Sequence, residues 1–117
     1  MDLVDRGAES PQETRLRLTL ISANLPRPRT QIEIYDDWGH VVARIDMGWP
    51  QWRVGVEYDG AQHWTDPRQR SRDIDRIAEA EAMRWRIVRV SAEMLRDRPA
   101  TIIARTRSAL MAAGFPL

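Results

Sequence analysis

The sequence predicts a single α/β domain in which helices pack on both faces of a small mixed β-sheet. With 117 residues the chain is long enough for one core but not for two. Segments with the apolar period of a helix alternate with short segments that have the two-residue period of a strand. The predicted order is helix, three strands, helix, strand and helix, in a domain over residues 8–113 between tails 1–7 and 114–117. A helix between the third and fourth strands favours parallel pairing of these two strands.

The first helix has a clear beginning. Ser10 suits the N-cap, Pro11 suits the first helical position, and Glu13 completes a capping box. The helix should end near Asn24, before two prolines. Its apolar face consists of Leu16, Leu20 and Ile21.

Three strands are predicted next. The first covers residues 31–35 and is followed by a turn over 36–39. In the second and third strands apolar residues alternate with polar ones, and residues 48–51 read as the hairpin connection between them. The alternation places three acidic residues on the face away from the apolar one, which can bring them onto a single surface: Asp46, Glu57 and Asp59.

The second half of the chain predicts a helix, a strand and a final helical segment. The helix runs from a cap at Asp66 to Met83, with Ile74, Ile77 and Ala78 facing inward. The segment 85–90 has apolar residues on both sides, which predicts a central strand flanked by layers, with Trp85 in the core. Residues 92–113 should be helical with an interruption near Pro99, and Gly114 should end the last helix.

The acidic surface is the strongest chemical signal. Three ionised carboxylates roughly 5 Å apart repel by about 3 kcal/mol per pair at an effective dielectric constant of about 20. Such a group either holds protons above the usual pKa or binds a metal ion. Carboxylates without cysteine are the ligands that Mg²⁺ or Mn²⁺ prefers. For any single acid, a solvated position or a salt bridge to an arginine is the simpler explanation, but three together favour the metal site.

Composition limits the possible functions. The chain has no cysteine, which excludes disulfides, zinc fingers and thiol catalysis. All eighteen basic residues are arginine, and the net charge is +1. Residues 1–60 hold seven arginines against ten acids, and residues 61–117 hold eleven against seven, which suits metal-assisted chemistry on a phosphate polymer. Neither a secretory signal nor an apolar stretch of spanning length is evident, so we expect a cytoplasmic protein without membrane partners.

Five motifs in order resemble those of a nuclease family. They are Glu13-Thr-Arg-Leu16, Arg44-Ile-Asp46, Val56-Glu-Tyr-Asp-Gly60 with His63, Asp73-x-x-Arg76 and Trp85-Arg-Ile-Val-Arg-Val90. Over residues 8–112 the chain resembles the very-short-patch-repair-like endonuclease branch of the PD-(D/E)XK superfamily, known mostly as a domain of unknown function. The resemblance implies a restriction-endonuclease-like core and hydrolysis of DNA phosphodiester bonds, by nicking one strand or cutting both. It also implies an N-terminal winged-helix domain, either fused or as a separate partner.

The resemblance further implies roles for particular residues. Asp46 and Glu57 would be the principal ligands of Mg²⁺, or of Mn²⁺ in its place, with the backbone carbonyl of Tyr58 and the Glu13 carboxylate as further ligands. His63 would accept a proton, since an imidazole has an ordinary pKa near about 6.5. Arg76, with Arg72 beside it, would neutralise charge on the phosphate. The residues expected to contact DNA are Arg68, Arg70, Arg72 and Trp64.

Two positions depart from the family pattern. Asp59 stands where the wider superfamily has lysine, so either Asp59 serves as a further ligand or acid, or His63 and an arginine take over the lysine's role. The same change motivates the alternative of a catalytically inactive DNA-binding or interaction module. Arg84 stands where the branch usually has glycine. If the turn needs positive φ, Arg84 costs roughly 1 kcal/mol.

Several residues keep an ordinary explanation beside the functional one. Glu13 is explained by its capping box, and Asp73 with Arg76 by a simple ion pair on one helix. His63 is equally a hydrogen-bonded loop residue. Trp49, Trp52 or Trp64 could stack on splayed bases. A glycosidase acid/base pair is a third reading of the carboxylates, which the small size of the domain disfavours.

Overall fold

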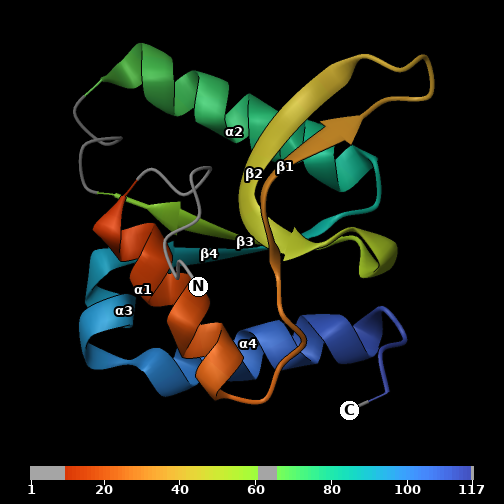
Figure 1. Cartoon of the computed structure of the whole chain (residues 1–117). Coiled ribbons are helices and arrows are strands. Elements are labelled where there is room, and N and C mark those ends of the chain that lie inside the picture. The colour runs from red at the N-terminus through yellow and green to blue at the C-terminus, as the bar shows by residue number, and fades with distance from the viewer. Residues whose placement is uncertain (1–9, 61–65, 117) are drawn as a thin grey trace.

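A computed structural model describes residues 10–60 and 66–116, which form a four-stranded mixed sheet between two layers of helices (Figure 1). The strands are β1 (Arg29–Tyr35), β2 (Val41–Trp49), β3 (Val54–Asp59) and β4 (Arg86–Ser91), in that spatial order. The first three pair in antiparallel fashion and β4 pairs with β3 in parallel. The predicted α/β class, mixed sheet and parallel pairing are therefore confirmed.

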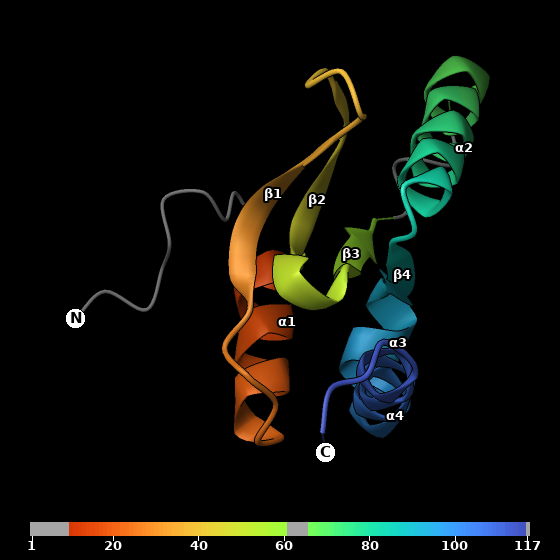
Figure 2. The ribbon, with the colours of Figure 1, turned by 90° about the vertical axis from the view of Figure 1, so that its right-hand side faces the viewer.

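Helices cover both faces of the sheet. The helix α2 (Pro67–Ala82) lies on one face, and α1 (Pro11–Ser22), α3 (Ala92–Asp97) and α4 (Pro99–Ala112) lie on the other (Figures 1 and 2). A short 3₁₀ helix, η1 (Pro50–Trp52), joins β2 to β3. The predicted order of elements is confirmed, and the predicted interruption at Pro99 is the break between α3 and α4.

Each face of the sheet has its own apolar cluster. The larger cluster joins α1, α3 and α4 to the strands, and its fully buried members include Leu16, Val56 and Ile102. The smaller cluster joins the C-terminal part of α2 to the β1–β2 hairpin through Ala80, Ile45 and Trp85. Burial of these two sets fixes the separate layers, because apolar area removed from water is the main stabilising contribution.

The predicted helix starts are confirmed by their caps. The Ser10 hydroxyl accepts a hydrogen bond from the Glu13 backbone N–H at 3.1 Å, and the Asp66 carboxylate accepts one from the Arg68 N–H at 3.0 Å. Both bonds satisfy N–H groups that have no partner within the helix. The last helix is followed by Gly114 with φ of 101°, as predicted.

The predicted inward face of α2 is wrong at Ile74 and Ala78, whereas Ile77, the third residue predicted to face inward, is partly buried. Ile74 is 58% exposed and Ala78 is exposed, whereas Asp73 and Arg76 are partly buried. The physical reason is the surface beneath the helix: Glu57 of β3 presents charge there, so the N-terminal part of α2 turns its polar side to the sheet. Only towards the C-terminal end does an apolar residue, Ala80, reach the core.

The predicted central position of the strand at residues 85–90 is also wrong. Among the strands that the structure describes, β4 lies at the edge of the sheet, beside β3 alone. Its apolar residues on both sides reflect the helical layers above and below it, because α2 covers one face and α4 the other. Apolar residues on both faces of a strand therefore indicate helical layers above and below it, and do not indicate how many strands lie beside it.

The turn between α2 and β4 holds Arg84 at φ of 67°, in the left-handed region. A residue with a Cβ is strained there, so we expect Arg84→Gly to raise the free energy of unfolding by about 0.5–1 kcal/mol, after the greater chain entropy of glycine is deducted. Urea denaturation measures this. Arg84→Ala is the control, because it removes the same exposed side chain and keeps the strain; an equal gain in both variants would contradict the explanation.

Candidate functional site

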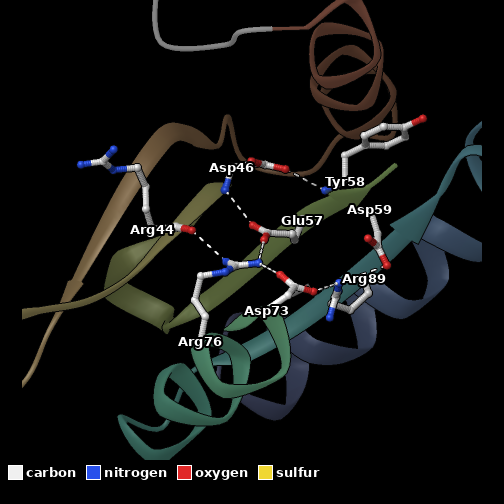
Figure 3. A network of polar contacts seen from close by, with 8 residues as sticks. All are labelled: Arg44, Asp46, Glu57, Tyr58, Asp59, Asp73, Arg76 and Arg89. Carbon is white, nitrogen blue, oxygen red and sulfur yellow. Dashed lines mark hydrogen bonds and ion pairs between the residues drawn. The ribbon is translucent and has the colours of Figure 1, made fainter. Parts of the chain in front are cut away.

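The site begins where β2 and β3 part. The two strands pair from Trp49 opposite Val54 to Met47 opposite Val56, so the next opposed residues are Asp46 and Glu57. Here the side chains take up backbone N–H groups. A Glu57 carboxylate oxygen (Oε2) accepts a hydrogen bond from the Asp46 N–H at 3.2 Å, and Asp46 Oδ2 accepts one from the Tyr58 N–H at 2.8 Å (Figure 3). The strand register therefore holds the two residues next to each other.

A pocket of about 310 Å³ lies beside these carboxylates, between the strands and α2. The strands contribute Asp46, Glu57 and Tyr58 to its lining. The helix contributes four residues at the spacing of a single helical face, which are Gln69, Arg72, Asp73 and Arg76. The polar side of α2 is therefore the side that closes the pocket.

Arg76 is the centre of the polar contacts. Its guanidinium donates hydrogen bonds to the Glu57 and Asp73 carboxylates and, at 2.9 Å, to the Arg44 backbone carbonyl (Figure 3). These partners come from β3, α2 and β2. Arg76 thus ties the helix to both strands and neutralises part of the charge of the buried Glu57.

A second arginine extends the network to β4. Arg89 lies opposite Glu57 in the parallel pairing, and its guanidinium contacts Asp59 at 3.0 Å and Asp73 at 2.6 Å. Asp59 is therefore bound to an arginine and does not line the pocket with Asp46 and Glu57. The three acids do not share one surface as predicted: both Asp46 and Glu57 line the pocket, but Asp46 turns towards Glu13 of α1 and Glu57 towards Arg76 of α2.

Glu13 reaches the site from the opposite helical layer. Its side chain is buried on α1 and hydrogen-bonds to the Asp46 side chain. A hydrogen bond between two carboxyl groups needs a proton on one of them. Glu13 thus has both roles that were considered, because its backbone N–H takes the Ser10 cap while its carboxyl group meets Asp46.

The two central carboxyl groups titrate well above their usual range. Burial and, to a smaller extent, the charge of Glu13 raise the pKa of Asp46 to about 6, although the Tyr58 N–H acts in the opposite direction. Burial and the charge of Asp46 raise the pKa of Glu57 to about 7, although Arg76 acts in the opposite direction. Near neutral pH the site therefore holds protons that another cation could replace.

The donors fit a hard divalent cation in chemistry. Asp46 and Glu57 offer carboxylate oxygens beside open space, and Glu13 adds a third carboxyl group next to Asp46. Within residues 10–60 and 66–116, however, no group of three or more histidine, cysteine, aspartate or glutamate side chains is arranged to hold a metal ion. The arrangement offers Asp46 and Glu57 as ligands, with Arg76 competing for one Glu57 oxygen.

The structure places the remaining predicted residues as follows. Arg72 lines the pocket, whereas Arg68 and Arg70 lie exposed on α2 and outside the lining. His63 and Trp64 fall outside the described residues. Trp85 is in the core as predicted, and Trp49 is also buried, so neither presents a face for base stacking; Trp52 is partly buried.

Sequence reasoning missed Gln69 and Arg89, and it gave Asp73 only an ion pair. The spacing of Gln69, Arg72, Asp73 and Arg76 was a usable signal, since these positions share one helical face. For Arg89 the signal was weaker, because Arg89 becomes informative only once the register places it opposite Glu57.

Comparison with known proteins gives two relatives from Mycobacterium tuberculosis, both uncharacterized. One belongs to strain CDC 1551 / Oshkosh and the other to strain ATCC 25618 / H37Rv. Each is 31% identical to this chain over 105 residues, and the match covers 90% of the chain but 38% of the relative. The chain thus spans less than two fifths of the length of these curated relatives. No protein-family model and no solved structure matches it. Among the described helices, none has the length and apolar character to cross a membrane.

Proposed function

We propose that the protein is a metal-dependent endonuclease that hydrolyses phosphodiester bonds in DNA, on a restriction-endonuclease-like core. One observation carries the proposal: Asp46 and Glu57 are held together where two strands part, beside a pocket that two arginines also line. Carboxylates for a divalent cation and guanidinium groups for a phosphate thus meet in one place. The motif order described above supports the same reaction.

The charges around the pocket favour an added cation. When ionised, Glu57, Asp59 and Asp73 carry three negative charges, which the three positive charges of Arg72, Arg76 and Arg89 balance. Asp46 and Glu13, when ionised, add two negative charges that no arginine of this group balances, and so leave an excess of negative charge. A divalent cation held by Asp46 and Glu57 would offset it and replace the protons now held there.

The residues of the chain divide the work in this proposal. Asp46 and Glu57 would hold Mg²⁺ or Mn²⁺, which polarises the scissile phosphate and lowers the pKa of an attacking water. Arg72 and Arg76 would bind the phosphate oxygens, and the exposed Arg68 and Arg70 would contact the DNA backbone further along α2. His63 remains the proposed proton acceptor. The additional length of the relatives leaves room for the proposed winged-helix domain.

The test is incubation of the full chain with supercoiled plasmid and Mg²⁺ or Mn²⁺, in comparison with EDTA. Asp46→Asn is the informative variant, because asparagine keeps an oxygen that accepts from the Tyr58 N–H and so should fold. We expect cleavage by the wild type and none by this variant. Asp97→Asn, at an exposed carboxylate of α3, is the matched control and should cleave normally. Cleavage that persists in Asp46→Asn would refute the proposal.

A second candidate is a DNA-binding module without catalysis. Two ion pairs favour it, Glu57 with Arg76 and Asp59 with Arg89. The site thus has no lysine to activate water, and these two arginines are already bound to carboxylates. This candidate predicts salt-dependent retention of DNA in EDTA and no metal uptake by calorimetry. Uptake of Mg²⁺ that Asp46→Asn abolishes would count against it.

A further inference from the structure

We propose that Arg89 is a positioning residue of the site: from β4 it fixes Asp73, and through Asp73 it holds the Arg76 guanidinium in the pocket. The effect on Arg76 stands on the geometry alone, whereas its importance for cleavage rests on the proposed function. Arg89 lies opposite Glu57, so its side chain stands on the same face of the sheet, under α2.

The two oxygens of Asp73 show the connection. One oxygen, Oδ1, contacts Arg76, and the other, Oδ2, lies 2.6 Å from Arg89. Arg89 is itself held at 3.0 Å by Asp59, two residues beyond Glu57 on β3. Asp59, Arg89, Asp73 and Arg76 therefore form a continuous chain of alternating charge that ends at Glu57 (Figure 3).

Arg89 does not pair with Glu57, whose carboxylate pairs with Arg76 instead. Although Arg89 stands opposite Glu57, both of its ion pairs among the described residues go to Asp59 and Asp73. Its buried Nε has no hydrogen-bond partner among those residues. The contacts of a terminal nitrogen with Asp59 and Asp73 therefore fix the orientation of the Arg89 guanidinium, although the Nε–H remains without a hydrogen bond to the described residues. If Arg89 served only to neutralise Glu57, it would not need to be held by these two aspartates.

This series of ion pairs predicts that the Arg76 guanidinium is restrained. Its two terminal nitrogens have separate partners, one the Arg44 carbonyl and the other Glu57 with Asp73, so rotation about the Nε–Cζ bond should be slow. If Arg89 is lost, Asp73 is free to move away from Arg76. In this view Asp59 supports the site through Arg89 and does not need to bind metal.

The experiment measures Arg76 by ¹⁵N NMR of the arginine side chains, without metal and without DNA. In Arg89→Met we expect the rotation rate of the Arg76 guanidinium to rise about tenfold or more. In Arg89→Lys it should stay near the wild-type value, because an ammonium group can still bridge the two aspartates. Arg86→Met is the control, since Arg86 is exposed on the same strand. Unchanged Arg76 signals in a folded Arg89→Met variant would overturn the inference.

Two further arms keep the test decisive. If Arg89→Met does not fold, Asp59→Ala replaces it, because alanine removes the oxygen that lies 3.0 Å from Arg89; unchanged rotation there overturns the inference. If the wild type cleaves DNA, Arg89→Met should lower kcat with little change in KM, and Arg89→Lys should restore kcat. An equal kcat in the Met variant would refute the catalytic part. Released Arg76 in a protein that cleaves no DNA would support the inference and refute the proposed function.

Discussion

Arg76→Met should destabilise the protein strongly at alkaline pH and only slightly at acidic pH. Glu57 is 6% exposed and depends on Arg76 for a compensating charge. Removing one partner of a buried ion pair leaves the other uncompensated, so we expect a loss of about 3 kcal/mol at pH 8.5. At pH 5 Glu57 is protonated in both proteins, because its pKa is already raised to about 7, and the loss should fall below about 1 kcal/mol.

Urea denaturation of both proteins at the two pH values measures this difference. Arg72→Met is the matched control, since it removes an exposed arginine from the same helix and leaves the Glu57 pair intact. The control should lose little stability at either pH. If Arg76→Met is equally destabilised at pH 5 and pH 8.5, the cost comes from lost packing and from the ion pair with Asp73, and the assigned pairing with Glu57 has no energetic role.

The wild-type protein without divalent cations should become less stable as the pH rises through 6 and 7. In the folded state the pKa of Asp46 is raised to about 6 and that of Glu57 to about 7, from 3.8 and 4.5. The folded protein therefore binds more protons than the unfolded chain in this window. Their contribution to stability is complete below about pH 4 and is lost as the pH rises through the folded values. For Glu57 alone the loss is on the order of 3 kcal/mol.

Other acids set the acidic limit. Arginine and tyrosine contacts lower the pKa of Glu33, backbone hydrogen bonds lower that of Asp36, and Arg76 and Arg89 lower that of Asp73 against the effect of burial. Their stabilisation is present above the unfolded pKa and is lost on further acidification. Urea unfolding in EDTA at pH values from 4 to 8.5 should show that the free energy of unfolding falls as the pH rises through 6 and 7. A flat profile across pH 5.5–7.5 would contradict the assigned burial of Asp46 and Glu57.

The effect of Mg²⁺ on stability should also depend on pH. An ion that binds only the folded protein at one hundred times its Kd adds about 2.7 kcal/mol. We expect Mg²⁺ to restore stability at pH 8 more than at pH 5, because it competes with protons for the same carboxylates. The comparison is made by urea unfolding with and without Mg²⁺. Stability that ignores Mg²⁺ at both pH values would contradict the proposed metal ligands.

The sequence predicted those features that follow from local period and short connections. Asp46 and Glu57 could be placed together because each lies on a strand with clear alternation, and only a few residues join the two strands. The caps at Ser10 and Asp66 were likewise visible, since capping depends on residues within one turn. The meeting of Asp46 with Glu57 and the beginnings of two helices were thus accessible without coordinates.

What failed depended on contacts between elements far apart in the chain. Ile74 was assigned to the core because apolar residues usually face inward, but the surface under α2 is charged and attracts Asp73 and Arg76 instead. Asp59 was grouped with the other acids because strand period cannot show that Arg89, from another strand, would bind it. The edge position of β4 was hidden because helices on both sides bury it as they would a central strand.

The parting of β2 and β3 has a consequence for the whole domain. A sheet normally insulates the helices above it from those below, because paired backbones leave no passage for polar groups. Here Glu13 from α1 contacts Asp46, and Glu57 beside Asp46 contacts Arg76 from α2, so ionisable side chains from both helical layers come together where the strands part. The ionisable groups of the two helical layers are therefore electrostatically coupled. A change in the protonation of Glu13 or Asp46 should alter the charge of Glu57 and so its interaction with Arg76.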